Sequence, residues 1–309
     1  DYTGGGCPHI LAEPQRTNKI TYSEDFSQWS TNDVLLESGY TAPDGSTNAY
    51  KVTKTGTTAY VVLSGVSADD DARTIYAKTV TGSGDVQLTS HNLNTNNLFT
   101  LTEEWQRFEV NSTPQIGTNF YAIDFRGVGS TLTELIIWGS QTEVGDYATS
   151  YIPTSGSTVT RNQDIFTRDG IGSLINSEEG VLFAEMAALS NDLTSRNISL
   201  NDGTYTNTVL LRYLDLSNQI QGVVRIGGSF KGICTHTLSD STISIKVAYK
   251  WKDTDFALWI NGSEVAKSSD VGAFSTNTIN KLSFDRGDGA EDFFGKVKQL
   301  QVYNTALTD

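Results

Sequence analysis

The sequence predicts an all-β protein made of two tandem antiparallel β-sandwiches of the jelly-roll type. Short runs of about four to eight residues alternate apolar and polar side chains, which is the period of a strand with one buried face. Clusters of Gly, Asn, Asp and Ser separate these runs, and helical periodicity is nearly absent. The chain has 309 residues, which is enough for two cores because one domain takes roughly 100–200 residues.

Changes in composition along the chain predict its domain organisation. Residues 1–16 are expected to be a lead-in segment, because three successive glycines and two prolines interrupt them. The first sandwich is expected over residues 17–150 and the second over residues 180–309. Residues 151–179 have the Pro-, Gly- and Ser-containing composition of a linker. Because the chain starts with Asp1 rather than Met, we expect it to be a piece of a longer protein.

Individual strands follow from the alternation of side chains. The run 121–125 is apolar at alternate positions, and the run 135–138 is apolar on both faces, which predicts a strand between two layers. In the second half the runs 243–249 and 256–260 alternate in the same way. The dipeptide Asn261-Gly262 then tolerates positive φ at both positions, so it predicts a type I′ hairpin.

The charge balance excludes two classes of partner. The chain carries 36 Asp and Glu against 22 Lys and Arg, a net charge of −14. Nucleic acids and anionic membrane surfaces both require concentrated positive charge, so neither is an expected partner. No apolar run approaches the ~18–20 residues that cross a bilayer, so no membrane insertion is expected.

Motifs for common catalytic sites are absent from the sequence. It contains no Gly-x-Ser-x-Gly elbow, no phosphate-binding Gly-rich loop and no His-Glu-x-x-His zinc motif. The Glu-x-Asp-x-x-Glu strand of jelly-roll endoglucanases is also missing. We therefore expect no enzymatic activity and no catalytic residue.

One acidic cluster leaves three interpretations open. Asp285, Asp288, Glu291 and Asp292 surround two glycines. The cluster can be a solvated loop, a set of oxygen ligands for Ca²⁺, or a carboxylate pair for glycoside hydrolysis, which needs two carboxyls about 5–10 Å apart.

Aromatic and amide side chains are the candidates for ligand binding. Sugar rings stack on aromatic side chains while Asn, Asp or Gln bind hydroxyls. Trp259 is a candidate because it lies opposite the apolar face of its strand, and Trp251 and Trp29 are further candidates; for each ring a core position is the alternative. The Asn-rich loop that contains His91 and Asn94 offers hydrogen bonds to a hydroxyl-rich ligand, or it is a plain loop.

The first half of the chain resembles a module that is frequent in phage and prophage structural proteins. The resemblance rests on ILAEPQRTN at residues 10–18, ITYSEDFSQW at residues 20–29 and APDGSTNA at residues 42–49. The stretch from WGSQTE to YATSYIPT, within residues 138–154, resembles the end of that module. This half is similar to a carbohydrate-binding-module jelly roll of the galactose-binding-like type.

The second half resembles a laminin-G or concanavalin-A-like jelly roll. The matching segments are GVLFAE at residues 180–185, ISLNDGT at residues 198–204 and DFALWING at residues 255–262. The tandem arrangement as a whole resembles that of phage tail-fibre or head-fibre proteins.

The resemblance implies a location, partners and a metal. It implies a virion surface protein made in the bacterial cytoplasm, or alternatively a secreted protein, with other virion proteins as partners and a homotrimer as the assembly. Galactose-binding-like modules often hold a structural Ca²⁺ between their first and last strands, which by position implies Asp25 and Glu134 as ligands here. No other cofactor is expected.

Three functional hypotheses follow. The first is a non-catalytic module of a phage fibre that recognises a host cell-surface glycan or an environmental polysaccharide through aromatic stacking and Asn or Asp hydrogen bonds. The second is a purely structural virion module without a ligand. The third is an accessory or catalytic part of a polysaccharide-degrading enzyme, for which the acidic cluster is the only sequence feature.

Overall fold

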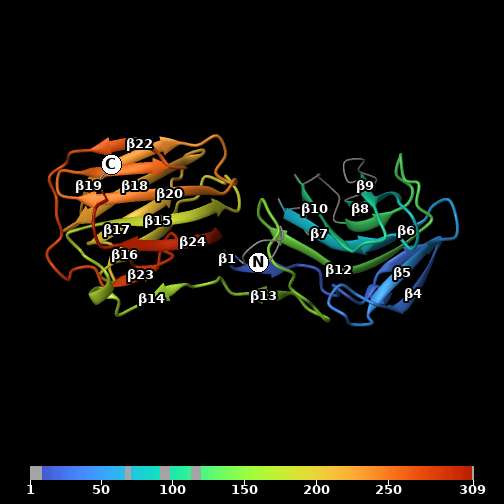
Figure 1. Ribbon diagram of the computed structural model, residues 1–309. Helices are drawn as coiled ribbons and strands as arrows, with labels where there is room; N and C mark the ends of the chain where they lie inside the picture. Colours follow the sequence, from blue (N-terminus) through green and yellow to red (C-terminus); the bar gives the residue numbers. More distant parts are fainter. Residues whose placement is uncertain (1–8, 67–70, 91–97, 113–119, 308–309) are drawn as a thin grey trace. The chain divides into compact units, whose positions relative to one another are not determined.

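In the computed structural model the chain divides into two compact units, each a sandwich of two antiparallel β-sheets (Figure 1). The structure describes residues 9–66, 71–90, 98–112 and 120–307. Gln15–Asn162 forms the N-terminal sandwich. Gln163 and the residues after it, together with the segment that ends at Pro14, form the C-terminal sandwich. The predicted fold class, all-β with two antiparallel sandwiches, is confirmed.

The N-terminal sandwich contains two five-stranded sheets and a two-stranded ribbon. The strand order of the first sheet is β10 (Gln106–Ser112), β7 (Asp71–Lys78), β12 (Glu134–Val144), β5 (Ala49–Lys54) and β4 (Val34–Tyr40). The second sheet has the order β3 (Ser30–Asn32), β6 (Tyr60–Ser64), β11 (Phe120–Asp124), β8 (Gly84–Ser90) and β9 (Leu98–Leu101). The ribbon pairs β2 (Arg16–Asn18) with β13 (Val159–Arg161), and the 3₁₀ turn η1 spans Phe26–Gln28.

The core of the N-terminal sandwich lies between its two five-stranded sheets. Val52, Leu135 and Ile137 come from the first sheet, and Tyr121 and Ile123 from the second, and all five are fully buried. The opposite face of β12 is apolar as well, because its residues 136 and 138 join a smaller buried cluster there. Both faces of the run 135–138 are therefore buried, one against the second sheet and the other under loop residues such as Ala42 and Tyr151.

The C-terminal sandwich contains two six-stranded sheets. The strand order of the first is β1 (Ile10–Ala12), β24 (Gly295–Tyr303), β15 (Glu179–Ala188), β20 (Ile245–Lys252), β21 (Phe256–Ile260) and β22 (Ser263–Ser268). The second has the order β14 (Thr167–Arg168), β23 (Lys281–Ser283), β16 (Arg196–Asn201), β17 (Thr208–Tyr213), β18 (Gln219–Ile226) and β19 (Ser229–Thr237). A 3₁₀ turn, η3, spans Gly172–Leu174.

Alternation along these strands builds the second core. Leu182, Tyr249 and Leu258 face inward from the first sheet and pack on Ile198 and Leu211 of the second. Residues of opposite parity on β15, β20 and β21 therefore point away from the core.

The segment before residue 17 is a correction to the predicted domain organisation. β1 pairs with β24, with Ile10 opposite Val297 and Ala12 opposite Gly295, and Ala12 is fully buried in the C-terminal core. The partner strand lies almost 300 residues away in sequence, and the local composition of residues 1–16 carries no sign of it.

The expected linker at residues 151–179 is also part of the two sandwiches. β13 pairs with β2 in the N-terminal sandwich, and β14 pairs with β23 in the C-terminal one. Ile152 is buried in the first unit and Ile175 in the second. Pro- and Gly-containing composition predicted the turns here but could not show that short strands lie between them.

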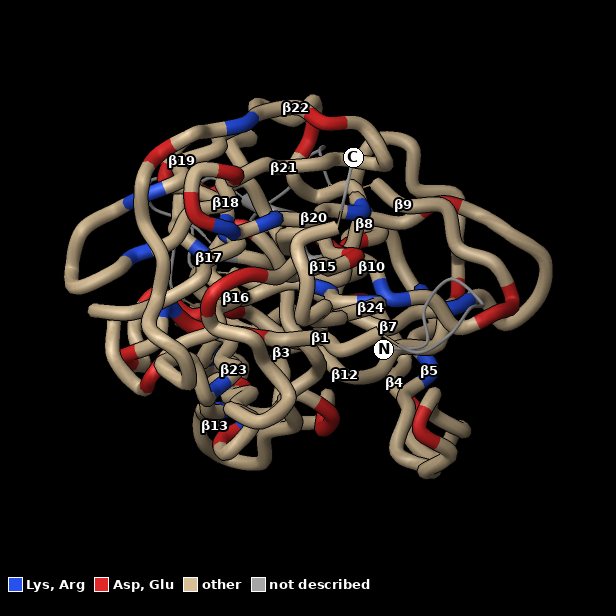
Figure 2. Tube along the Cα trace, turned by 60° about the vertical axis from the view of Figure 1, so that its left-hand side comes forward, with Lys and Arg blue, Asp and Glu red and all other residues tan. Residues whose placement is uncertain are grey.

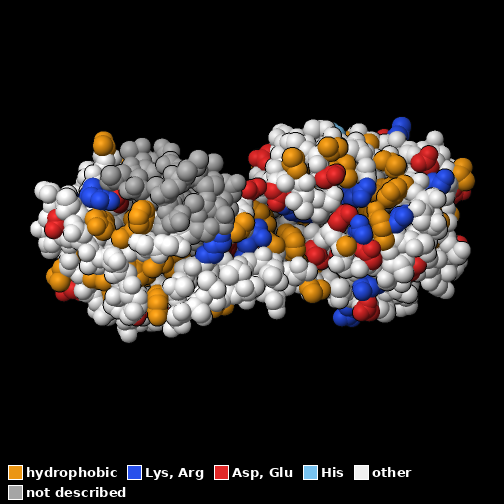
Figure 3. Space-filling view, turned by 180° about the vertical axis from the view of Figure 1, so that it is seen from behind, with side chains coloured by type: hydrophobic (Ala, Val, Ile, Leu, Met, Phe, Trp, Pro, Cys, Tyr) orange, Lys and Arg blue, Asp and Glu red, His pale blue; other side chains and the backbone are white. Residues whose placement is uncertain are grey.

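Charged residues, and the apolar side chains on the face shown, are spread over many elements (Figure 2, Figure 3). Figure 2 shows Asp and Glu on many separate loops and strands rather than on one element. On the face that Figure 3 displays, hydrophobic side chains lie in small groups among polar and charged ones. Within the described residues, no helix has the length and apolar character needed to cross a membrane.

Candidate functional site

The outer face of the first C-terminal sheet brings together side chains from three strands. Phe183 on β15 lies opposite Ala248 on β20, and Ala248 lies opposite Trp259 on β21. Val181 lies opposite Lys250 in the same register. These five residues point away from the core, because their neighbours in sequence occupy it.

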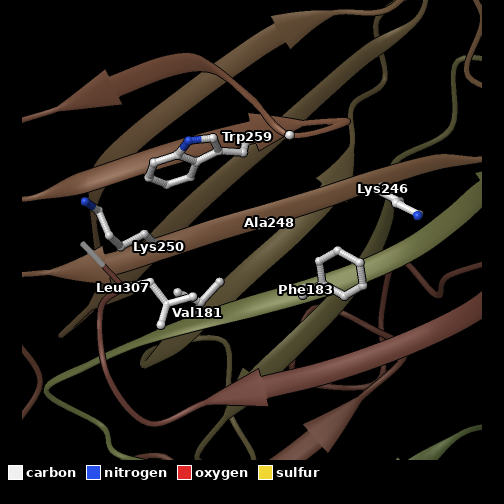
Figure 4. Close-up of a pocket in the computed structure, with 8 residues that line it drawn as sticks. Val181, Phe183, Lys246, Ala248, Lys250, Trp259 and Leu307 are labelled. Carbon is white, nitrogen blue, oxygen red and sulfur yellow. The ribbon is translucent and has the colours of Figure 1, made fainter. Parts of the chain in front are cut away.

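These side chains line a pocket of about 430 Å³. Figure 4 shows the Trp259 ring on one strand, the two lysines on the next, and Val181 and Phe183 on the third. Leu307, which follows β24, closes one side. The walls are therefore mainly apolar, and the polar groups of the lining are the ammonium groups of Lys246 and Lys250. Lys246 is exposed, whereas Lys250 is buried.

Trp259 is held in this pocket by a buried cation. The ammonium of Lys250 lies 5.2 Å from the centre of the Trp259 ring, a distance typical of a cation–π contact. Lys250 itself is only 3% exposed, and its Nζ lies 2.9 Å from a carboxylate oxygen of Asp255. The Trp259 side chain is half-buried, so its ring is supported on one side and still reachable from solvent.

Trp251 and Trp29, the other two predicted ligand-binding rings, belong to cores. Trp251 is 1% exposed, and its Nε1 donates to the carbonyl of Ser177 at 3.1 Å. Trp29 is 5% exposed, and its Nε1 donates to the carbonyl of Tyr22 at 3.0 Å. Each indole has its donor satisfied by backbone and its faces covered by core side chains, so the predicted ligand role is corrected for both.

The predicted polar loop is not part of the described chain. His91 and Asn94 lie outside the described residues, so their role in ligand binding stays a prediction.

The two carboxylates predicted as calcium ligands have separate partners. Asp25 accepts hydrogen bonds from Tyr50 Oη at 2.8 Å and from the Ser27 backbone N–H at 3.1 Å, and these bonds hold its pKa below the ordinary value, with the Ser27 hydroxyl as the largest cause. Glu134 forms an ion pair with Lys51 Nζ at 2.8 Å. Glu134 already has a cation as its partner, which argues against a Ca²⁺ ion shared by Asp25 and Glu134. Among the described residues, no three His, Cys, Asp or Glu side chains form a metal-binding group. Calcium binding stays a prediction, which a thermal melt with and without chelator tests.

The acidic cluster at residues 285–292 contains its own counter-ion. Arg286 Nε lies 3.0 Å from Asp288, and Arg286 Nη1 lies 2.7 Å from Glu291. Asp292 accepts a hydrogen bond from Gln163, and burial raises its pKa above the ordinary value. A loop braced by an arginine describes this segment better than a free set of acidic ligands does.

Of the eight residues that line the pocket, Trp259 alone was predicted to bind a ligand; Phe183 and Lys250 are among those that were missed. The alternation within GVLFAE already places Phe183 on the other face of its strand from Leu182, so this signal was available in the sequence. The pairing of β15 with β20 was not available, because it joins segments about 65 residues apart.

Comparisons with known proteins give structural likenesses only. No protein-family model matches the chain, and no curated protein matches it. Among solved structures, the chain is similar to the CBM40 module of a Ruminococcus gnavus sialidase, with 17% identity, a TM-score of 0.38, and coverage of 46% of this chain and 94% of that one. It is similar to sheep galectin-11, with 8% identity, a TM-score of 0.31, and coverage of 45% and 97%. It is also similar to domains LG4–5 of the mouse laminin α1 chain, with 10% identity, a TM-score of 0.32, and coverage of 82% and 90%.

Proposed function

We propose that the C-terminal sandwich is a non-catalytic glycan-binding module whose ligand packs on Trp259. The observation that carries this proposal is the position of that indole. Trp29, Trp138 and Trp251 are each at most 5% exposed, whereas Trp259 lies half-buried in a pocket on the outer face of a sheet. A half-buried indole beside apolar side chains suits the apolar face of a pyranose ring.

The chemistry of the pocket supplies both parts of sugar recognition. Trp259 and Phe183 offer ring surfaces that replace water over the C–H groups of a sugar. Lys246 is exposed at the pocket and can donate hydrogen bonds to hydroxyl or carboxylate oxygens. Lys250 fixes the indole before a ligand arrives, which reduces the entropy lost on binding.

The setting that we propose for this module is the surface of a phage virion, in a tail or head fibre. It is supported by the sequence resemblance of the two halves, and it makes other virion proteins, and a homotrimer of this chain, the proposed partners. Sedimentation of the purified chain tests the trimer: a monomer at every concentration would contradict it.

A glycan array tests the proposed function. We expect the full chain to bind at least one glycan and Trp259→Ala to weaken that binding by about 1–3 kcal/mol, by analogy with the stacking of bases on aromatic rings. Trp105→Ala is the matched control, because Trp105 is a half-buried indole beside Lys78 in the N-terminal sandwich. A folded chain that binds nothing on the array would favour a structural virion module instead.

A further inference from the structure

The N-terminal sandwich has a pocket of its own, and its walls are polar. The pocket has a volume of about 420 Å³ and lies where β4 and β5 meet two loops. Its lining includes the carboxylates of Glu24 and Asp25, the amide of Asn48, the phenol of Tyr50 and the hydroxyls of Ser38 and Thr47. A concave site with several converging polar groups and one ring suits a hydroxyl-rich ligand.

Glu24 is fixed in this pocket by neutral donors. Its Oε2 accepts a hydrogen bond from Asn48 Nδ2 at 2.7 Å, and its Oε1 accepts one from Tyr151 Oη at 3.0 Å. Asn48 is held in turn, because its Oδ1 accepts from Trp138 Nε1 at 2.8 Å. A carboxylate has about four acceptor positions, and these bonds use two of those on Glu24.

Asp25 is fixed in a similar way by neutral donors. Tyr50 Oη donates to its Oδ1 at 2.8 Å, which also sets the position of the Tyr50 ring. Gln28 Nε2 donates to its Oδ2 at 3.3 Å. Hydrogen bonds thus hold the two carboxylates in position before any ligand binds.

The charge of these two carboxylates is left uncompensated by the described residues. No Lys, Arg or His is among the residues that line the pocket, and neither carboxylate forms an ion pair within the described part of the chain. This differs from Glu134, which has Lys51, and from the cluster at residues 285–292, which has Arg286. The pocket therefore favours a cationic ligand and disfavours an anionic one.

We propose that this pocket binds a saccharide that carries a protonated amino group. The ammonium compensates the charge of Glu24 and Asp25, and the sugar hydroxyls hydrogen-bond to the free acceptor positions and to Asn48, Ser38 and Thr47. The inference extends the proposed glycan-binding function to the N-terminal sandwich. It does not depend on Trp259.

Calorimetric titration of the full chain at pH 6 tests this proposal. The probes are a β-1,4-linked glucosamine tetramer and its fully N-acetylated counterpart, which has the same ring skeleton without the charge. We expect the amino tetramer to bind at least tenfold more tightly, Glu24→Gln to reduce its affinity at least tenfold, and Trp259→Ala to leave it unchanged. Equal affinities for the two tetramers, or no binding of the amino tetramer, would overturn the proposal.

Two more variants and a competitor show whether the amino tetramer binds in this pocket and whether its sugar ring matters. Glu37→Gln removes the same charge from an exposed position of β4 that does not line the pocket, so it should leave the affinity unchanged. Ser38→Phe fills the pocket from an exposed position and should abolish binding even if Glu24→Gln fails to fold.

Spermidine carries ammonium groups without a sugar ring; if it competes as strongly as the tetramer does, charge alone explains binding and saccharide recognition is wrong. If only the Trp259→Ala variant loses binding of the amino tetramer, the ligand occupies the C-terminal pocket and this inference fails while the proposed function stands.

Discussion

Glu143 shows how a single buried carboxylate organises the end of the N-terminal sandwich. It is fully buried on β12, where its oxygens accept hydrogen bonds from the Thr149 backbone N–H at 2.9 Å and the Thr149 hydroxyl at 2.6 Å. Gln141 donates to the same carboxylate and in turn accepts from the Ile152 N–H at 2.6 Å. These bonds attach residues 149–152 to β12. Burial is the largest influence on Glu143 and raises its pKa above the ordinary value of 4.5.

This raised pKa predicts a pH dependence of stability. An acid whose folded pKa is raised favours the folded state most when it is protonated, so its contribution is fully present below the ordinary pKa and is lost as the pH rises through the folded pKa. Glu143→Gln removes this titration. We expect the free energy of unfolding of the wild type, relative to Glu143→Gln, to fall as the pH rises from about 4.5 toward neutral. Urea unfolding of both proteins across this window checks it, and a difference that does not vary with pH would contradict the assignment.

Single tryptophans show what the sequence could predict at this scale. Alternation within residues 256–260 placed Trp259 away from the core, and the structure agrees. The same rule continued the core face from Tyr249 to Trp251, so a core position was readable for Trp251 as well. Trp29 follows a 3₁₀ turn, where the alternation of a strand gives no indication of which side chains are buried. It is buried against Phe26 and Tyr121, whose ring centres lie 4.9 and 5.5 Å from the centre of the Trp29 ring.

At the scale of one element, the turn of the β21–β22 hairpin follows from local sequence. Asn261 and Gly262 adopt φ values of 50° and 85°, which are the left-handed values that a type I′ turn requires. The prediction of this hairpin is confirmed. It also positions the candidate site, since Gly262 lines the pocket beside Trp259.

Gly262→Ala is expected to destabilise the hairpin through the backbone alone. A Cβ at this position meets no atom within 4 Å, so the cost is that of a left-handed L-residue, about 1–2 kcal/mol. Ser263→Ala in the same exposed turn serves as the control and should change stability by less than about 0.5 kcal/mol. Thermal melts of the two variants check this, and equal melting temperatures would argue against the left-handed turn.

The sheet that carries the pocket was predictable only in part. Its strands β15, β20 and β21 were readable one by one from alternation, but their pairing was not. A strand shows which residues share a face, whereas the pocket depends on which strand lies beside which. Phe183, Ala248 and Trp259 become neighbours only through that pairing.

At the scale of the whole molecule, the two sandwiches have separate cores. The buried cluster of the N-terminal sandwich draws on residues 20–137, and that of the C-terminal sandwich on residues 12 and 175–297. Two sandwiches were predicted from chain length and strand pattern, but the assignment of β1 to the second one was not. Pairing across almost the whole chain leaves no local signal in composition.

Ala12→Asp tests the assignment of β1. A charge at this fully buried position has no partner in the core, so we expect a loss of about 2 kcal/mol or more, confined to the C-terminal sandwich. In calorimetry the transition of that sandwich should shift down by several degrees while the other stays in place. Ile10→Asp, at a 40% exposed position of the same strand, should have a much smaller effect. A shift of the N-terminal transition instead would contradict the β1–β24 pairing.

The central claim is that a glycan packs on Trp259. The most direct test follows the indole N–H signals of the five tryptophans by NMR during titration with a glycan identified on the array. Loss of one signal in Trp259→Phe assigns it. We predict that this signal shifts on binding, while the signals of the buried Trp29, Trp138 and Trp251 stay in place. A bound glycan that leaves the Trp259 signal unmoved would contradict the claim.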